Sequence, residues 1–325
     1  MIRVGLVGTG YAARLRVQAL QADPRAQLVA IVSHSLSRTQ AFVDDYGVQR
    51  FTSLEEALRA VELDLIVIAT VNAEHATLAR TALLAQKHVV VEYPLALTLE
   101  DANNLIALAR SQRCLLHVEH IELLGSLQQA FVHNLEAVGN VGYVQYTTVK
   151  PQRPAPRRWN YQLSQFGFPL VGALSRLQRL IKVFGLVDSI SCQAYMWSVD
   201  STASEHHFST CLCTAQLAFK CGVAAQVTYG KGERIWLAER RLEVHGDRGA
   251  LHFDGNQGVL IHADATQTLE VGSRRGVFAA DTRQVLDHLT TGQPLYIIPE
   301  ESVYALKVAL AAATASKTGQ RVHLD

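Results

Sequence analysis

Three small residues near the N-terminus have the spacing of a dinucleotide-binding turn. Gly8, Gly10 and Ala13 form the pattern G-x-G-x-x-A between a short apolar run and a helical pattern. The first glycine allows a tight turn, the second leaves room for a pyrophosphate, and the helix N-terminus supplies N–H groups and a positive dipole end. The predicted phosphate-binding residues are Gly8, Thr9, Gly10, Tyr11 and Ala12. The alternative is a glycine-rich turn that binds nothing.

The second predicted strand, residues 27–33, ends in polar and basic residues. About twenty residues past the glycine turn, NAD-binding folds usually carry an Asp or Glu for the ribose hydroxyls. Ser33, His34, Ser35 and Arg38 stand here instead. Hydroxyl donors beside a cation suit a 2′-phosphate. We therefore predict NADPH in preference to NADH, with a merely solvated loop as the alternative.

Further polar residues follow the next two predicted strands. The continuous apolar run 63–70 is typical of a buried parallel strand, and Thr70, Asn72 and His75 stand at its end. Glu92 and Tyr93 follow the strand 89–91, and the proline after Tyr93 favours an extended conformation there. Because open α/β sheets bind ligands beyond their carboxyl ends, we expect these side chains near the cofactor. Asn72 is alternatively only a helix cap.

The alternation of these strands with helices predicts the fold of the first part of the chain. Helical patterns cover 38–46, 53–61, 77–85 and 99–110. A fifth strand is expected near 114–120, and Glu119, His120 and Glu122 cluster where it ends. Five βα units make a doubly wound parallel sheet. We predict an NADP-binding Rossmann domain over residues 1–122.

From about residue 141 the pattern becomes alternating and rich in β-formers. Successive strands joined by turns predict a largely antiparallel open sheet, and residues 167–185 between the first two strands have helical spacing. Helices over 276–289 and 299–316 close the chain. We predict a substrate-binding α+β domain over residues 123–325, with the last helix packing back on the first domain.

The composition excludes several classes of function. A net charge of +1 gives no global field for nucleic acid or an acidic membrane surface. We expect no membrane span and no leader peptide, and therefore a cytoplasmic protein. The five cysteines have no C-x-x-C pairing, so we expect reduced thiols and no metal site.

Several motifs resemble the Gfo/Idh/MocA oxidoreductase family: the Rossmann domain, A-T-x-N-x-x-H, E-x-P after a strand, and the open C-terminal sheet. The sugar dehydrogenases of that family carry E-K-P with a catalytic lysine, and an Asp and a His on a later helix. Here Tyr93 replaces the lysine, and Val171, Ser175 and Gln178 stand at the later positions. Without that proton relay, sugar oxidation is disfavoured.

Longer motifs resemble the biliverdin reductases of bacteria and cyanobacteria. They are V-E-Y-P-L-A-L-T, H-V-E-H-I-E-L-L, F-G-F-P-L-V-G-A-L-S-R, Y-G-K-G-E, H-G-D-R-G and G-S-R-R-G. The resemblance implies NADPH-dependent reduction of biliverdin IXα at its C10 methine bridge, with protonation of a pyrrole nitrogen, to give bilirubin. It extends over both predicted domains.

A flat tetrapyrrole with two propionates needs apolar walls and a few cations. The predicted substrate-binding residues are Arg176, Arg179, Lys231, Arg234, Arg274, Arg275, Phe168 and Tyr229. The predicted catalytic residues are Arg176, as an electrostatic and orienting group, then Tyr93, Glu119 and Glu122. Alternatively, Tyr93 shapes the cofactor pocket, Arg179 is a surface charge and Glu122 is a solvated cap.

Two other functions stay open from the sequence. One is a different NAD(P)-dependent oxidoreductase of the same fold, which would fail to turn over biliverdin. The other is a non-catalytic NADP-binding sensor, which would bind the cofactor without turnover. The sequence predicts either a monomer or a homodimer.

Overall fold

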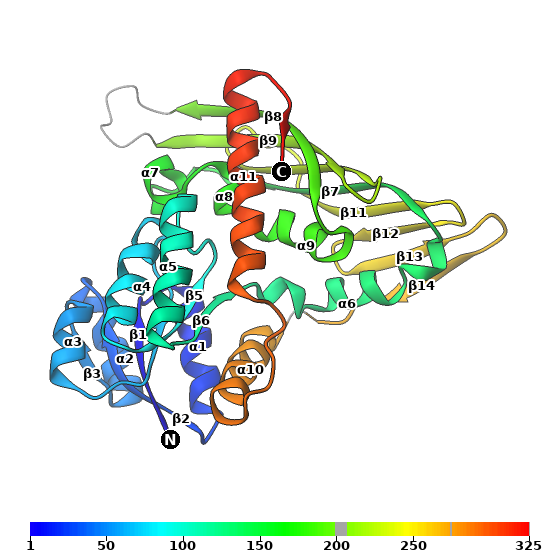
Figure 1. Cartoon of the computed structure of the whole chain (residues 1–325). Coiled ribbons are helices and arrows are strands. Elements are labelled where there is room, and N and C mark those ends of the chain that lie inside the picture. Colours follow the sequence, from blue (N-terminus) through cyan, green and yellow to red (C-terminus); the bar gives the residue numbers. More distant parts are fainter. Residues whose placement is uncertain (199–206, 274, 325) are drawn as a thin grey trace. The chain divides into compact units, whose positions relative to one another are not determined.

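The computed structural model describes residues 1–198, 207–273 and 275–324 (Figure 1). Contacts along the chain divide it into two compact units. The first unit combines Met1–Ile121 with Gly276–Val303, and the second combines Glu122–Arg275 with Tyr304–Asp325. The division expected after residue 122 differs from this grouping mainly because residues 276–303 return to the first unit.

The first unit contains a six-stranded parallel sheet in the order β3-β2-β1-β4-β5-β6. Its strands are β1 (Ile2–Val7), β2 (Ala26–Val32), β3 (Gln49–Phe51), β4 (Leu65–Ile68), β5 (His88–Glu92) and β6 (Leu116–Glu119). This order confirms the predicted Rossmann sheet. The sequence missed β3, because three residues are too few to show a strand periodicity.

Six helices belong wholly to this unit. They are α1 (Tyr11–Gln21), α2 (Leu36–Tyr46), α3 (Leu54–Ala60), α4 (His75–Leu84), α5 (Leu99–Gln112) and α10 (Val277–Thr291). Helix α10 packs on α1, and the start of α11 (Pro299–Thr318) also lies in this unit. The helix that mainly returns to the Rossmann sheet is therefore the first of the two closing helices, whereas the sequence analysis assigned this role to the last.

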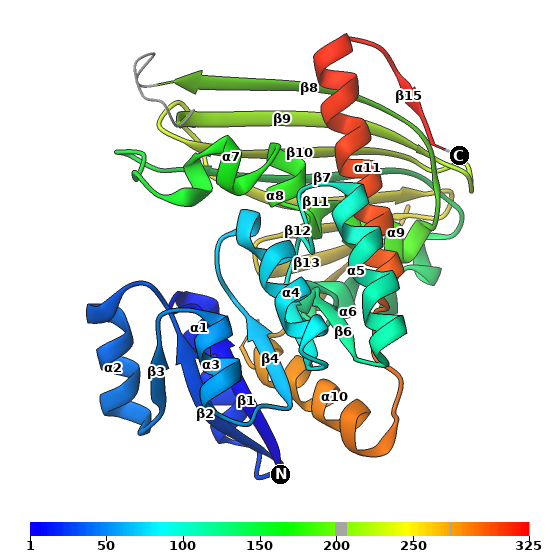
Figure 2. The same ribbon diagram turned by 60° about the vertical axis from the view of Figure 1, so that its left-hand side comes forward.

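The second unit is built on a nine-stranded sheet in the order β14-β13-β12-β11-β7-β10-β9-β8-β15 (Figure 2). Its strands are β7 (Val141–Pro151), β8 (Val187–Ser198), β9 (Phe208–Phe219), β10 (Ala224–Gly232), β11 (Glu239–Gly246), β12 (Ala250–Asp254), β13 (Gln257–Ile261), β14 (Thr266–Glu270) and β15 (Val322–His323). All neighbours are antiparallel except β7 and β10. The predicted, largely antiparallel sheet is confirmed.

Short helices cover one face of this sheet (Figures 1 and 2). They are α7 (Leu163–Phe166), α8 (Pro169–Gly172) and α9 (Ser175–Phe184), preceded by α6 (Ser126–His133). The single helix predicted over 167–185 is broken at Ala173, whose ψ of 34° ends α8. The sequence analysis did not predict α6. Helix α9 carries the residues that the candidate site uses.

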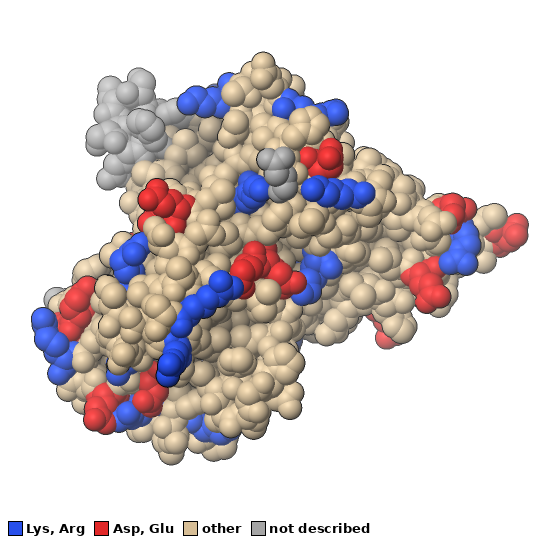
Figure 3. All heavy atoms as spheres, viewed as in Figure 1, with Lys and Arg blue, Asp and Glu red and all other residues tan. Residues whose placement is uncertain are grey.

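The distribution of charged side chains can be followed on one face of the molecule. On the face drawn in Figure 3, the basic and acidic residues that the structure describes are interspersed. Within the described residues, no helix combines the length and apolar composition that a membrane crossing requires. Any recognition of an anion therefore depends on a local group of cations.

The aromatic side chain of Phe131 fixes α6 in the core of the second unit. It is fully buried and lies 6.1 Å from the ring of Phe184. We expect Phe131→Ala to lower the free energy of unfolding by about 3–5 kcal/mol, because the cavity cannot fully collapse. The neighbouring Val132 is 52% exposed, so Val132→Ala should change it by less than about 0.5 kcal/mol. Urea unfolding followed by tryptophan fluorescence measures both; equal losses would contradict this assignment.

Candidate functional site

The glycine turn joins β1 to α1 and leaves space outside the backbone. Gly8 has a φ of 116°, and a Cβ atom there would lie 2.2 Å from the carbonyl oxygen of Ala69. Only glycine fits this crossing of two backbone segments. A Cβ atom on Gly10, by contrast, would meet nothing within 4 Å. Among the described residues, no side chain caps α1 at Gly10, so its first N–H groups face this space. The turn therefore fits a pyrophosphate.

The other residues of the turn differ in exposure. Thr9 and Ala12 are half-buried, Tyr11 is 78% exposed and Ala13 is fully buried between helix and sheet. Exposure of Tyr11 at the start of α1 leaves its ring available to a ligand. Burial of Ala13 shows why a small residue is required at the third position of the motif.

The end of β2 lies beside this turn. The N–H group of Gly8 donates to Val32 at 2.9 Å, and Ser33 comes next in the chain. The Ser33 hydroxyl accepts from the N–H group of Ser35 at 3.2 Å, and Ser35 is the N-cap of α2. His34 is exposed. Arg38 lies in the first turn of α2, and its side chain is outside the described part of the structure. Two helix N-termini and two serines thus gather at neighbouring strand ends.

The segment after β4 is largely buried. The Thr70 hydroxyl donates to the carbonyl oxygen of Val71 at 3.4 Å, and Asn72 is 4% exposed. The buried His75 ring donates from Nδ1 to the carbonyl oxygen of Pro94 at 2.8 Å. Burial lowers the pKa of His75, which keeps the ring neutral. His75 therefore ties the end of β4 to the segment that follows β5.

That segment carries two of the predicted site residues. Glu92 ends β5 and stands opposite Glu119 on β6. Tyr93 precedes Pro94 through a cis peptide bond, and its ring stacks on the His120 ring with centroids 5.0 Å apart. The structure thus brings Glu92, Tyr93, Glu119 and His120 together at the carboxyl end of β5 and β6, where open α/β sheets bind ligands.

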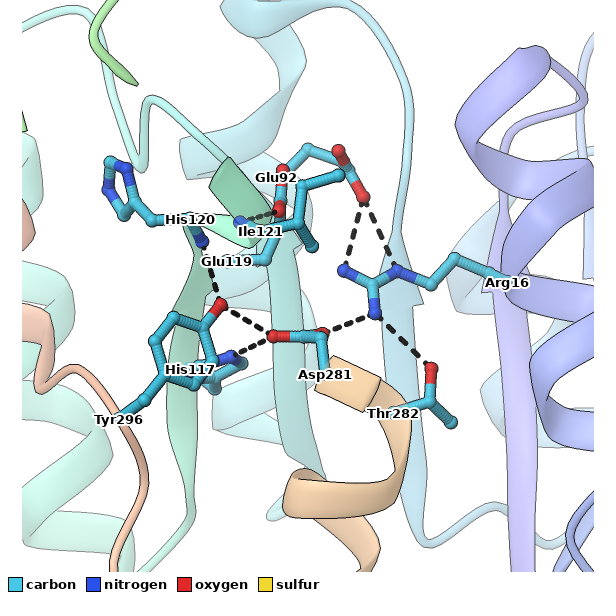
Figure 4. Close-up of polar contacts among 9 residues, drawn as sticks. All are labelled: Arg16, Glu92, His117, Glu119, His120, Ile121, Asp281, Thr282 and Tyr296. Carbon is cyan, nitrogen blue, oxygen red and sulfur yellow. Dashed lines mark hydrogen bonds and ion pairs between the residues drawn. The ribbon is translucent and has the colours of Figure 1, made fainter. Parts of the chain in front are cut away.

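A buried arginine links this strand end to two helices (Figure 4). Arg16 on α1 is 1% exposed and donates from Nε and Nη2 to Glu92 Oε1, at 3.4 Å each. Its Nη1 forms an ion pair with Asp281 on α10 and donates to the Thr282 hydroxyl at 3.3 Å. The sequence analysis missed Arg16, although a charge at position 16 on the buried stripe of Ala13, Val17 and Leu20 was a usable signal.

Asp281 is the anionic centre of the same cluster. It accepts from His117 Nε2 at 2.8 Å and from the Tyr296 hydroxyl at 2.7 Å (Figure 4). Burial opposes ionisation of Asp281, but Arg16 and His117 outweigh it and hold its pKa well below the usual range. Tyr296 in turn accepts from the His120 backbone N–H at 3.0 Å. Residues 276–303 therefore fix the residue that stacks on Tyr93.

Glu119 is a buried carboxyl group at the end of β6. It is 1% exposed, and its Oε2 accepts from the Ile121 N–H at 2.8 Å. Burial, followed by the neighbouring Glu92, raises its pKa well above the usual range. The raised pKa favours the protonated form of Glu119, next to Tyr93.

The second unit places two arginines of α9 over phenol rings of the sheet. The Arg176 guanidinium lies 5.4 Å from the Tyr229 ring, and it donates to the hydroxyls of Thr148 at 3.2 Å and Ser175 at 2.9 Å. The Arg179 guanidinium lies 5.6 Å from the Tyr146 ring. These arginines give the helix-covered face of the sheet a local positive charge.

Arg179 belongs to the interior. It is 2% exposed and donates to Gln128 Oε1 at 2.7 Å and to the Glu122 carbonyl oxygen at 3.5 Å. The alternative that Arg179 is a surface charge is therefore wrong. Glu122 is half-buried beside it. The structure thus brings Arg176, Arg179, Glu122 and Tyr229 into one region of the second unit.

Lys231 is turned toward aromatic rings. Its Nζ lies 3.8 Å from the Phe166 ring centroid and 4.7 Å from that of Tyr161, and it donates to the Asn160 carbonyl oxygen at 2.5 Å. It is 7% exposed, and burial lowers its pKa to about 8. In this structure the lysine stabilises the aromatic cluster around Tyr161, Phe166 and Phe208.

The remaining predicted substrate residues lie elsewhere in the second unit. Phe168 is half-buried at the start of α8, and Arg234 is exposed after β10 with its guanidinium 5.7 Å from the Trp197 ring. Arg275 is exposed before α10, its N–H bonded to the Ser273 hydroxyl. Arg274 lies outside the described residues. Among the described residues, no group of His, Cys, Asp or Glu could hold a metal ion.

Two protein-family models match the chain. An oxidoreductase model with an NAD-binding Rossmann fold matches residues 2–120, and the model of its C-terminal alpha/beta domain matches residues 134–324. The chain belongs to the Gfo/Idh/MocA oxidoreductase family. At the family positions named above, this member has the buried Val171, Ser175 and Gln178, and Ser175 accepts from Arg176.

Individual members of the Gfo/Idh/MocA family differ in how similar they are to this chain. The biliverdin reductase of Synechocystis, solved with biliverdin and NADP+, is 48% identical over 97% of this chain and 99% of its own, with a TM-score of 0.93. Mouse biliverdin reductase A is 28% identical over 79% of this chain and 80% of its own. The aldose-aldose oxidoreductase of Caulobacter crescentus shares only the fold, at 18% identity over 99% of each chain and a TM-score of 0.86.

Burial of His120 makes stability depend on pH. Burial lowers its pKa from 6.5 to about 3, so between these values the unfolded chain binds a proton that the folded chain does not. The contribution of His120 to the stability of the fold is therefore complete above pH 6.5 and is lost as the pH falls. This histidine alone should account for about 2 kcal/mol of lost unfolding free energy between about pH 7.5 and pH 5.

We expect His120→Gln to remove that part of the pH dependence, whatever its effect at pH 7.5. The control is His34→Gln, which alters an exposed ring and should keep the wild-type dependence. Urea unfolding at both pH values measures the difference. An unchanged difference in His120→Gln would show that the ring is not held neutral by burial.

Proposed function

We propose that this protein is an NADPH-dependent biliverdin reductase, which transfers a hydride to C10 of biliverdin IXα and yields bilirubin. The observation that carries the proposal is the 48% identity, over nearly the whole of both chains, with a biliverdin reductase solved with biliverdin and NADP+. The absence of a carboxylate between Ser33 and Arg38 supports NADPH over NADH.

The residues of the first unit fit the cofactor. The open space at Gly10 and the first N–H groups of α1 would receive the pyrophosphate, and Ser33, His34, Ser35 and Arg38 would receive the 2′-phosphate. Thr70, Asn72, Glu92 and Tyr93 would border the nicotinamide. When bound, NADPH supplies the hydride.

The residues of the second unit fit an anionic, aromatic substrate. Arg176 lies over the Tyr229 ring, so a propionate of the tetrapyrrole can pair with a guanidinium that the aromatic ring holds in place. Since an arginine stays protonated, Arg176 orients the substrate and stabilises charge. Arg234 and Arg275 are exposed and would pair with propionates at the rim. Tyr93, as a hydroxyl donor, and Glu119 stay predicted catalytic residues of the first unit.

The proposal is tested by mixing the purified protein with biliverdin IXα and either NADPH or NADH. We expect loss of the red absorption of biliverdin and growth of the blue absorption of bilirubin, faster with NADPH. If a folded protein that binds NADPH converts no biliverdin, the assignment is wrong. Turnover of another carbonyl or alcohol substrate would then indicate a sibling oxidoreductase, and binding without any turnover would indicate a sensor.

The glycine turn supplies a second prediction. Gly10 has a φ of −77°, which alanine adopts readily, and a Cβ atom there meets only open space. We therefore expect Gly10→Ala to fold normally but to weaken NADPH binding at least about tenfold, because the methyl group occupies the phosphate position.

Gly142→Ala is the matched control, since a Cβ atom there also meets nothing within 4 Å, and Gly142 belongs to β7 of the second unit. Fluorescence titration with NADPH and thermal melts measure both variants. Equal NADPH affinity in Gly10→Ala and the parent would place the phosphates elsewhere.

A further inference from the structure

The phenol of Tyr146 stands among cations on the helix-covered face of the nine-stranded sheet. Tyr146 and Thr148 are two residues apart on β7, so they share a face. Tyr229 on β10 is in register with Thr148, and so is Arg240 on β11. The side chains of Tyr229 and Arg240 therefore belong to the same face.

The helix side adds two further cations. Arg179 lies 5.6 Å from the Tyr146 ring, and Arg176 is bonded to Thr148 on the same strand. Tyr146 is 4% exposed, so these charges act on it through little water. Among the described residues, the charges that act on this phenol are those of Arg176 and Arg179 from α9, Arg240 from β11 and the carboxylate of Glu122 before α6.

These charges act differently on the two phenols of this face. Burial alone would raise the pKa of Tyr146, but Arg179, Arg176 and Arg240 outweigh it, and Glu122 opposes them only in part, so the pKa is lowered. Burial raises the pKa of Tyr229. Among the described residues, Arg176 is the cation that opposes this increase. The cations therefore favour the phenolate of Tyr146 over that of Tyr229.

We propose that Tyr146 is a further catalytic residue, the proton donor to a pyrrole nitrogen of the bound substrate. The inference rests on the proposed function. In the step, C10 forms a bond to the hydride that leaves the nicotinamide, the Tyr146 O–H bond breaks, and an N–H bond forms on the pyrrole. The phenolate that is left is stabilised by the arginines, and it regains its proton from solvent. Arg176 and Arg179 cannot donate this proton themselves, because a guanidinium stays protonated.

The proposal is tested with Tyr146→Phe, which removes only the hydroxyl. We expect kcat for biliverdin to fall about 10²-fold or more, with the dissociation constants of biliverdin and NADPH changed less than about threefold. In the parent, kcat falls as the pH rises through the pKa of the donor, and this decline should be absent from the residual activity of Tyr146→Phe. Tyr143→Phe is the kinetic control, because Tyr143 is three residues away on the same strand and therefore on the opposite face.

A readout that needs no turnover is the appearance of tyrosinate absorption on raising the pH. The earliest tyrosine to ionise in the parent should be missing from Tyr146→Phe and present in Tyr229→Phe. A kcat within threefold of the parent, or an unchanged first ionisation in Tyr146→Phe, would overturn the role of Tyr146 and leave the reductase assignment intact. Absence of biliverdin turnover by the parent would instead overturn the proposed function, and the donor role with it.

Discussion

The buried guanidinium of Arg16 is the interaction on which the first unit depends. A charge at this depth costs several kcal/mol unless it is paired, and Asp281 and Glu92 pair it from two different elements. One side chain on the helix of the glycine turn therefore fixes both α10 and the end of β5. Asp281 also accepts hydrogen bonds from His117 and Tyr296. Because Tyr296 accepts from the N–H group of His120, the ion pair also helps to position the histidine that stacks on Tyr93.

The second unit uses charge in another way. Arg176 and Arg179 lie over phenol rings, where the ring face attracts a cation and low solvent exposure strengthens the field. Lys231 also lies over an aromatic ring, but its ammonium group is enclosed by the aromatic cluster that it contacts. Lys231 thus stabilises a core, whereas Arg176 and Arg179 give the helix-covered face of the sheet a local positive charge.

The strongest predictions from the sequence were those whose signals lie in neighbouring residues. Short motifs with known backbone conformations predicted three features: the glycine turn, the strand ends at Ser33 and Glu92, and the arginine pair on one helix. The buried partner of Arg16 could not be predicted, because Asp281 lies 265 residues further along the chain. The aromatic surroundings of Lys231 escaped for the same reason, since Tyr161, Phe166 and Phe208 come from separate segments.

The return of residues 276–303 to the first unit has a consequence for how the chain is made. During synthesis, Arg16 and Glu92 leave the ribosome long before Asp281, and eight of the nine strands of the second unit's sheet are translated between them. Until then the nascent Rossmann segment has a guanidinium in its interior without its main counter-ion, and a helix-sized apolar area of α1 uncovered. Until residues 276–303 are translated, the first part of the chain to be made therefore keeps an incomplete core, and over that interval it exposes the kind of surface that molecular chaperones bind.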